Sequence, residues 1–181
     1  MDGFHLTRAA LSALPNPSEA HARRGAAFTF DAVAFSALVT ALRGPIAPSP
    51  TPELAKEGAV GDEGTIYAPS FDHAVKDPKE NDIPIHPHHR VVIIEGNYTA
   101  LNHPAWAPAA GLFDELWFVD VPFDVARRRL IQRHVKAGIA ADEDEARRRA
   151  DESDLINGKE IVENMMPIDE TVRSLPDEDW V

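Results

Sequence analysis

The amino-acid sequence predicts an α/β protein with a parallel sheet flanked by helices. Two short apolar runs indicate the sheet: 91–94 (VVII) consists only of β-branched residues, and 116–121 (LWFVDV) is interrupted only by Asp120. Continuous runs of this kind are typical of strands buried on both faces, as in parallel sheets. Helical patterns precede the first run and follow the second, and strands that alternate with helices indicate βαβ units.

The N-terminal part is expected to be helical. Residues 6–14 have the pattern of a short helix, which ends before a Pro-Asn-Pro sequence. Ser18 is expected to cap a second helix. The strongest helical pattern begins after Asp31, its predicted N-cap, and carries apolar residues at helical spacing until Gly44 ends it.

The rest of the chain is expected to alternate between loops, strands and helices. Residues 45–64 are rich in proline, glycine and charge, which predicts a long flexible loop. Residues 65–78 contain β-branched and aromatic residues and are expected to hold a short extended piece. The expected C-terminal elements are a helix that follows Pro122 and covers about 123–136, two charged helices within 142–154 and 157–165, and a short strand within 170–175.

Composition limits the function classes. The 181 residues fit one domain, 1–181, with 44% apolar and 27% charged residues, as in ordinary globular proteins. A net charge of −12 argues against a nucleic-acid surface and against an anionic membrane. No apolar run approaches the ~18–20 residues of a membrane span. The absence of cysteine excludes disulfides and thiolate sites, and fits a reducing, cytoplasmic location.

Three acidic residues follow predicted turns or strands. Ligands of α/β sheets bind beyond the carboxyl ends of the strands. Asp2 lies in a DGFH turn, Glu95 directly follows the first apolar run, and Asp120 lies near the end of the second. The sequence predicts that these carboxylates belong to one site, and the alternative for each is a turn or cap carboxylate.

The helix expected after Asp120 carries a cluster of arginines, at Arg127, Arg128, Arg129 and Arg133. Arg129 and Arg133 are four residues apart and therefore project from one face. Clustered guanidinium groups match phosphate oxygens, and the alternative is a solvated face paired with nearby acids. The apolar residues of 123–136 form no clean stripe, which favours a lid-like helical segment over about 123–152.

Two histidine-containing stretches are further candidates. Asp72 and His73 follow the aromatic residues Tyr67 and Phe71, and this group could hold a polar, hydroxyl-bearing substrate. An ordinary surface turn is the alternative. The 86–89 tract (HPHH) resembles a metal-binding sequence, but its proline and short spacing favour an exposed loop.

Five segments, taken in order, carry a family resemblance: MDGFHLTR, RRGAAFTFDAVAF, IYAPSFDH, VVIIEGNY and LWFVDVPFDVARRRLIQRHVKAG. They resemble the uridine kinase, phosphoribulokinase and pantothenate kinase branch of the P-loop kinases, and most closely the fructose-transport-kinase-like and fungal ATP-dependent-kinase-like proteins. The resemblance covers almost the whole chain and weakens between 45 and 64. It implies a P-loop NTPase-type sheet and phosphoryl transfer from ATP, with Mg²⁺, to a hydroxyl of a nucleoside, sugar or pantothenate-like compound.

The resemblance also implies roles for the reacting groups. Asp2 matches the aspartate that accepts the proton of the attacking hydroxyl, a role that orients the nucleophile. Glu95 matches the acidic residue near Mg²⁺. Arg129 and Arg133 match lid arginines that neutralise charge on the transferring phosphoryl group, and we expect Arg128 to bind the nucleotide with them.

The acceptor would be bound by a second set of residues. Tyr67, Asp72 and His73 match the substrate-side segment of the family. We also place His5, Arg23 and Arg24 on the substrate side.

One motif of the family is absent from the sequence. No G-x-x-x-x-G-K-[ST] loop occurs, and the single Gly-Lys pair, Gly158-Lys159, continues to Glu160. In the family this loop lies upstream of DGFH and cradles the nucleotide phosphates. The resemblance therefore predicts an incomplete, N-terminally truncated kinase domain with impaired activity. The alternative is a non-catalytic kinase-fold remnant that binds a metabolite or a partner chain.

The missing segment would include the first strand, which is central in the family, between the two apolar runs. Unpaired buried backbone groups cost roughly 1–3 kcal/mol each, against a typical stability of roughly 5–15 kcal/mol. We therefore expect marginal stability, unless neighbours close up or a partner chain supplies the strand, and we leave a homo-oligomer open. Cooperative unfolding well above ~65 °C would contradict this expectation.

Overall fold

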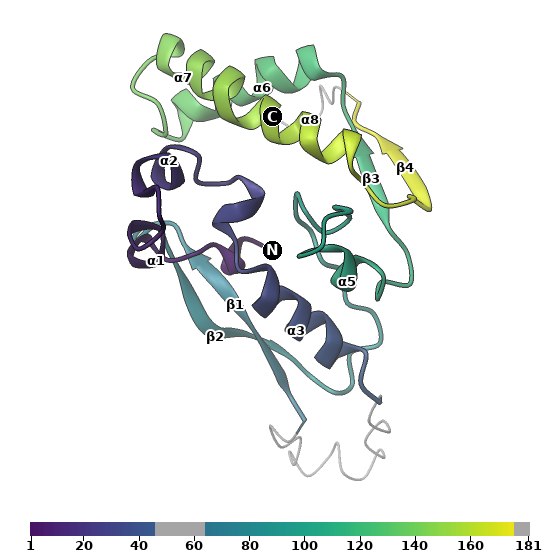
Figure 1. Ribbon diagram of the computed structural model, residues 1–181. Helices are drawn as coiled ribbons and strands as arrows, with labels where there is room; N and C mark the ends of the chain where they lie inside the picture. Colours follow the sequence, from purple (N-terminus) through teal and green to yellow (C-terminus); the bar gives the residue numbers. More distant parts are fainter. Residues whose placement is uncertain (46–63, 176–181) are drawn as a thin grey trace.

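The computed structural model describes residues 1–45 and 64–175, and shows an α/β arrangement of two small sheets and several helices (Figure 1). The loop expected at 45–64 falls almost wholly outside the described residues. The single-domain organisation and the lid-like role of 123–152 stay predictions.

The N-terminal part consists of short helices: η1 (Asp2–Phe4), α1 (Arg8–Ser12), α2 (Pro17–Ala22), η2 (Ala27–Thr29) and α3 (Ala32–Leu42). Helix α3 begins as predicted, because the Asp31 side chain accepts a hydrogen bond from the backbone N–H of Ala34 at 2.8 Å. The predicted Ser18 cap is wrong. Pro17 starts α2 after the N-cap Asn16, since the fixed φ of proline suits the first helical position.

An antiparallel hairpin follows, made of β1 (Ile66–Asp72) and β2 (Asp77–Ile85). The extended piece expected at 65–78 is confirmed as β1, but β2 was not predicted. This strand contains Pro78 and Pro84 and many charged residues, a composition that only an edge strand tolerates.

A parallel pair forms the second sheet, in which β3 (Trp117–Asp120) lies beside β4 (Glu170–Arg173). Both strands and the parallel pairing were predicted. The helices between them are α6 (Phe123–Lys136), α7 (Glu143–Arg149), the π-helical η3 (Ala150–Asp154) and α8 (Leu155–Glu163). The predicted helix after Pro122 is confirmed as α6. A short helix, α5 (Ala107–Ala110), precedes β3.

The apolar run at 91–94 does not form the predicted strand. Val91, Val92 and Ile93 are 77%, 43% and 89% exposed, and the segment has no assigned secondary structure. The prediction of a strand buried on both faces is wrong, because no neighbouring strand pairs with the segment in the described parts of the chain. Only Ile94 packs against the main core. In β3, Trp117 and Val119 are also more than half exposed.

The main core is an aromatic cluster between the N-terminal helices and the segment after 95. Its largest members are Phe4, Phe30, Phe35, Tyr98 and Trp106. The ring of Phe35 lies 5.3 Å from that of Phe4 and 5.6 Å from that of Trp106. These contacts hold η1 against α3 and therefore fix the DGFH turn.

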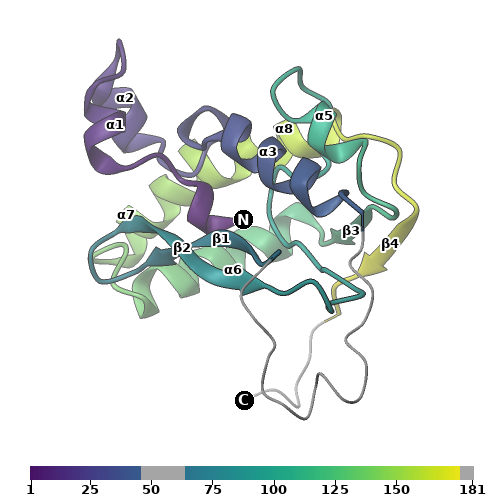
Figure 2. The same ribbon diagram turned by 90° about the horizontal axis from the view of Figure 1, so that it is seen from below.

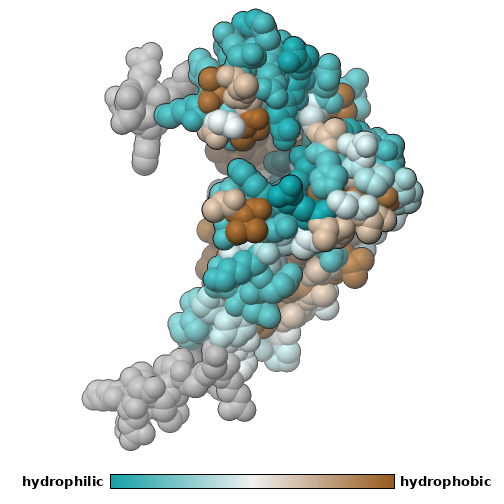
Figure 3. Space-filling view, turned by 90° about the vertical axis from the view of Figure 1, so that its left-hand side faces the viewer, coloured by the Kyte–Doolittle hydropathy of each residue, from teal (hydrophilic) through white to brown (hydrophobic). Residues whose placement is uncertain are grey.

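A second, smaller cluster joins α6 to α7 and consists of Ile131, Ala140, Ala146 and Ala150. It is tied to the N-terminal part by a hydrogen bond from Arg23 to Asn157 at 3.0 Å. The surface over α6 and α7 is mainly hydrophilic, and the molecule is hollowed between it and the N-terminal part (Figure 3). Within 1–45 and 64–175, no helix has the length and apolar character needed to cross a membrane.

Candidate functional site

The DGFH turn lies between α3 and the β1–β2 hairpin (Figure 2). Gly3 is buried against the hairpin, and a Cβ atom at this position would lie 2.0 Å from the carbonyl oxygen of Pro69. Only glycine therefore allows the turn to approach β1 this closely. Phe4 is 7% exposed and anchors the turn in the aromatic core on the other side.

Gly3→Ala is expected to destabilise the fold by about 3 kcal/mol, because the added methyl group collides with backbone that cannot rotate away. Gly111→Ala is the matched control, since its Cβ would meet its nearest neighbour at an ordinary 3.5 Å. Urea unfolding of both variants measures the difference. Equal stability of the two variants would contradict the close approach of Gly3 and Pro69.

The turn borders an open cavity of about 550 Å³, which is also lined by the hairpin and the 91–95 segment. Its polar lining residues are Asp2, Ser70, His73, His89 and Glu95. The N-terminal ammonium group of Met1 donates a hydrogen bond to the carbonyl oxygen of Glu95 at 2.5 Å, so the residue next to Asp2 contacts Glu95. This larger cavity therefore gathers Asp2, His73 and Glu95 from three separate parts of the sequence.

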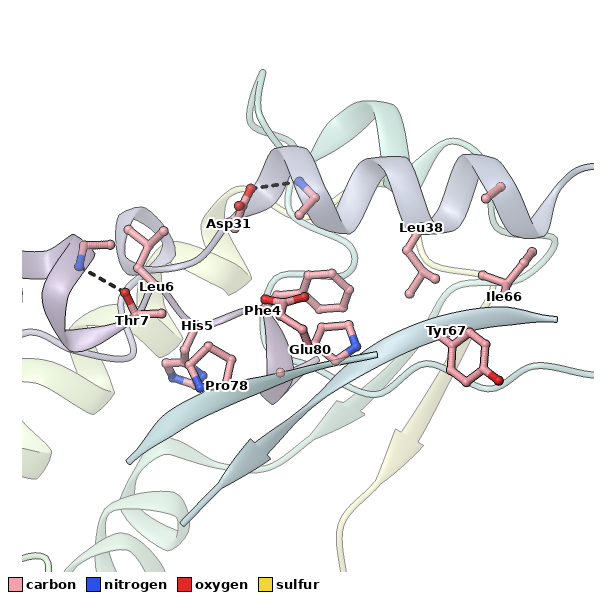
Figure 4. Close-up of a pocket in the computed structure, with 15 residues that line it drawn as sticks. Phe4, His5, Leu6, Thr7, Asp31, Leu38, Ile66, Tyr67, Pro78 and Glu80 are labelled. Atoms are coloured by element: carbon pink, nitrogen blue, oxygen red, sulfur yellow. Dashed lines mark hydrogen bonds between the residues drawn. The ribbon is translucent and has the colours of Figure 1, made fainter. Parts of the chain in front are cut away.

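A smaller cavity of about 440 Å³ lies on the other side of Gly3 and Phe4, between α3 and the hairpin (Figure 4). Its polar lining residues are His5, Thr7, Asp31, Tyr67 and Glu80. The structure thus places His5 and Tyr67 together, and Figure 4 shows the Tyr67 hydroxyl pointing away from α3. Sequence reasoning interpreted Asp31 only as a helix cap and gave no signal for Glu80.

His5 is held in an aromatic setting. Its ring centroid lies 4.0 Å from that of Phe30 and 5.0 Å from that of Phe71. Nδ1 lies 2.7 Å from the carbonyl oxygen of Asp2, so this nitrogen carries the proton of the neutral ring. Burial lowers the pKa of His5 below its ordinary value, and the nearby Arg24 charge acts in the same direction. The neutral ring is therefore the form that the fold favours.

Stability is expected to fall as the pH drops below about 6.5, the ordinary pKa of histidine. In that range the unfolded chain protonates His5 while the folded chain resists protonation, so folding is favoured at the higher pH. Urea unfolding between about pH 5 and 7.5 tests this dependence, and His5→Asn should flatten it. If the free energy of unfolding of the His5→Asn variant depends on pH as steeply as that of the parent, groups other than His5 cause the dependence.

Arg24 fixes the hairpin against the N-terminal part. Its guanidinium group donates to the carbonyl oxygens of Leu6 at 3.0 Å and Lys76 at 2.6 Å, and to Asp77 Oδ1 at 3.0 Å. The adjacent Arg23, which was also placed on the substrate side, donates to Asn157 and lines neither cavity. The sequence offered no means of separating these adjacent arginines.

Asp72 stabilises the turn of the hairpin and lines neither cavity. Its Oδ1 accepts hydrogen bonds from the backbone N–H groups of Ala74 at 2.8 Å and Val75 at 3.1 Å. These bonds lower the pKa of Asp72 below its ordinary value. The geometry is that of the turn carboxylate which the sequence left open as an alternative.

Three of the four arginines of α6 are bound to other side chains. Arg127 forms two hydrogen bonds with Asp151, at 2.6 and 2.7 Å, and Arg128 pairs with Asp124 at 2.8 Å. Arg129 donates to Ser174 Oγ at 2.8 Å, and Arg133 is exposed. None of the four lines the two cavities, and neither does Asp120, which lies exposed at the end of β3. The phosphate-binding roles of Arg128, Arg129 and Arg133 stay predictions.

The residues that the structure describes, 1–45 and 64–175, include no phosphate-binding loop that could hold a triphosphate. The sequence has no G-x-x-x-x-G-K-[ST] loop, whose backbone N–H groups and lysine would hold the phosphates. In the described part of the chain, no cluster of three His, Cys, Asp or Glu residues could hold a metal ion, and this includes the 86–89 tract. The role of Glu95 near Mg²⁺ also stays a prediction.

No family model matches the sequence. Several curated proteins are similar to it in sequence. The ATP-dependent kinase-like protein notR′ of Aspergillus versicolor is 46% identical over 172 residues, which cover 95% of this chain and 92% of the relative. A uridine-kinase-like protein of Schizosaccharomyces pombe is 39% identical, with 97% and 68% covered. The ATP-dependent kinase YFH7 of Kluyveromyces lactis is 33% identical, and the chain spans about half of its length (52%).

Two solved structures resemble the fold. A fructose-transport-system-kinase-like protein from Silicibacter sp. TM1040 has a TM-score of 0.76 at 30% identity, with 94% of this chain and 71% of that chain covered. YFH7 from Saccharomyces cerevisiae, described as a circularly permuted P-loop-containing kinase, also has a TM-score of 0.76, at 28% identity. It covers 98% of this chain, which spans 57% of its length.

Proposed function

Because this chain belongs to the family of ATP-dependent-kinase-like proteins that share the P-loop kinase fold, we propose that it carries the acceptor side of an ATP-dependent small-molecule kinase. The observation that supports the proposal is the larger cavity, in which Asp2, His73 and Glu95 come together beside the hairpin. The acceptor is a hydroxyl-bearing compound such as a nucleoside, a sugar or a pantothenate-like molecule.

Asp2 would orient the acceptor hydroxyl and accept its proton. Its carboxylate is exposed at a cavity wall, while Gly3 and Phe4 hold the turn rigidly against the hairpin and the core. A positioned carboxylate with these properties suits general-base chemistry. His73 and Ser70 supply hydrogen-bonding groups to the same cavity. The adjoining smaller cavity, with His5, Asp31 and Glu80, would hold the polar remainder of a larger acceptor.

The donor side needs groups that this sequence does not contain. ATP and Mg²⁺ are the co-substrate and metal that the family implies, but the residues present do not form their cradle. We therefore derive no step through the nucleotide. Our proposal includes low activity of this chain by itself and dependence on a phosphate-binding loop.

Calorimetric titration of the 181-residue chain with uridine, fructose and pantothenate tests the acceptor side. We expect one class to bind, and both Asp2→Asn and His73→Ala to weaken its binding. Glu163→Gln, on the exposed end of α8, is the matched control and should bind normally. If no compound of the three classes binds, the acceptor-side proposal fails.

A non-catalytic, metabolite-binding protein is the second candidate function. The pairing of Arg127 with Asp151 and of Arg128 with Asp124 favours it, because these guanidinium groups are bound to carboxylates and not free for a phosphate. The two functions can be distinguished by joining a strand and a G-x-x-x-x-G-K-[ST] loop ahead of Met1. Transfer to the bound acceptor supports the kinase, whereas nucleotide binding without transfer supports the non-catalytic protein.

A further inference from the structure

Acidic side chains line the smaller cavity on two sides. Asp31 lines it from the N-cap of α3, and Glu80 lines it from the hairpin (Figure 4). Among the residues that the structure describes, no lysine or arginine lines this cavity, and Met1 with its terminal amino group does not line it either. The described walls therefore hold two carboxylates and no permanently positive group.

The basic side chains beside these lining residues have other partners. Lys79 stands between the lining residues Pro78 and Glu80, and successive residues of a strand point to opposite faces. Lys79 accordingly pairs with Asp82. Arg24 is already bound to a carboxylate and to two backbone carbonyl groups. Neither cation is placed to neutralise Glu80 without breaking these bonds.

The two carboxylates of the cavity form no ion pair with the described part of the chain. One oxygen of Asp31 accepts the cap hydrogen bond from the backbone N–H of Ala34, and its second oxygen is left for a ligand. Glu80 is exposed at the cavity wall. Both negative charges are therefore available to act on a bound group.

The other walls do little to offset this charge. His5 stays neutral, because burial lowers its pKa below the ordinary value. Much of the remaining wall is apolar and includes Phe4, Leu38 and Ile66. Charges act more strongly beside apolar walls than in open water. A negative group that enters this cavity would therefore be repelled by two carboxylates and attracted by no described cation.

We infer that the acceptor carries no negative charge on the part that enters the smaller cavity, so that an uncharged or amine-bearing alcohol is selected over its carboxylate or phosphate counterpart. Unpaired charges in a site discriminate mainly by rejecting the wrong ligand. The inference rests on the proposed function, because it concerns the same acceptor, and it names Glu80 as a residue that determines specificity.

Matched ligand pairs test this selection by calorimetric titration of the 181-residue chain at about pH 8, where imidazole groups are ordinarily neutral. Each pair joins an uncharged compound to its carboxylate counterpart: uridine and orotidine, glucose and glucuronate, panthenol and pantothenate. In the class that binds, we expect the carboxylate to bind at least about tenfold more weakly than the uncharged compound.

A charge reversal in the cavity shows whether Glu80 causes the preference. Glu80→Lys should reduce the preference at least about tenfold or reverse it, and Glu80→Gln should have a smaller effect in the same direction. Both variants should fold, because Glu80 is exposed. Glu163→Lys, at the exposed end of α8, is the matched control and should leave the preference unchanged.

The possible outcomes separate this inference from the proposed function. Equal binding of the two members of a pair would overturn the inference and leave the acceptor site standing. A preference that Glu80→Lys does not change would also overturn it, because the discrimination would then arise outside the smaller cavity. If no member of any pair binds, the proposed function fails and the inference fails with it.

Discussion

Asp2→Asn is expected to lower acceptor phosphorylation by about 10²–10⁴-fold in a protein that joins this chain to a strand and phosphate-binding loop ahead of Met1. The amide keeps the size of the side chain but cannot accept the proton of the attacking hydroxyl. Steady-state kinetics should show the loss in kcat, with the KM for ATP nearly unchanged.

The control for this variant is Asp114→Asn, an exposed carboxylate that pairs with Arg43 and lines neither cavity. It should turn over at the parental rate. An Asp2→Asn protein that retained more than about a tenth of the parental kcat would remove Asp2 from the base role.

Phe35→Ala is expected to destabilise the fold by about 3–5 kcal/mol, the usual cost of a large cavity in an aromatic core. Phe35 is fully buried and contacts both Phe4 and Trp106. Since typical domains are stable by only about 5–15 kcal/mol, this loss should leave little folded protein under mild denaturation. The DGFH turn should become mobile as well, because Phe4 loses its main support.

Urea unfolding measures the free energy, and Phe28→Ala is the matched control. Phe28 is 47% exposed and contacts the guanidinium group of Arg23, so its removal should cost about 1 kcal/mol or less. If the two phenylalanine variants unfolded at the same urea concentration, the aromatic cluster would not be the main source of stability.

Elements with strong local signals could be predicted from the sequence. Helix α3 has an N-cap and regular apolar spacing, and α6 begins directly after a proline. Strand β2 could not be predicted, because its charges and two prolines are unlike those of a core strand. The 91–94 run has the composition of a buried strand, but burial depends on neighbouring chain that composition does not describe.

The candidate site could likewise be predicted only in part from the sequence. The sequence predicted one site for Asp2 and Glu95, and both line one cavity although 91–94 forms no strand; their roles stay predictions. Roles that depend on the direction of a side chain could not be predicted from the sequence. Arg24, not Arg23, holds the hairpin, and the α6 arginines find local partners that the sequence could only suggest.

The central proposal is that the residues 1–181 carry the acceptor side of a small-molecule kinase. Its most direct test is acceptor-dependent transfer of a radiolabelled γ-phosphate from ATP, measured for the 181-residue chain with and without the strand and phosphate-binding loop joined ahead of Met1. We expect transfer to uridine, fructose or pantothenate only with the added segment. Full transfer by the chain alone, or ATP binding without transfer by the joined protein, would contradict the claim.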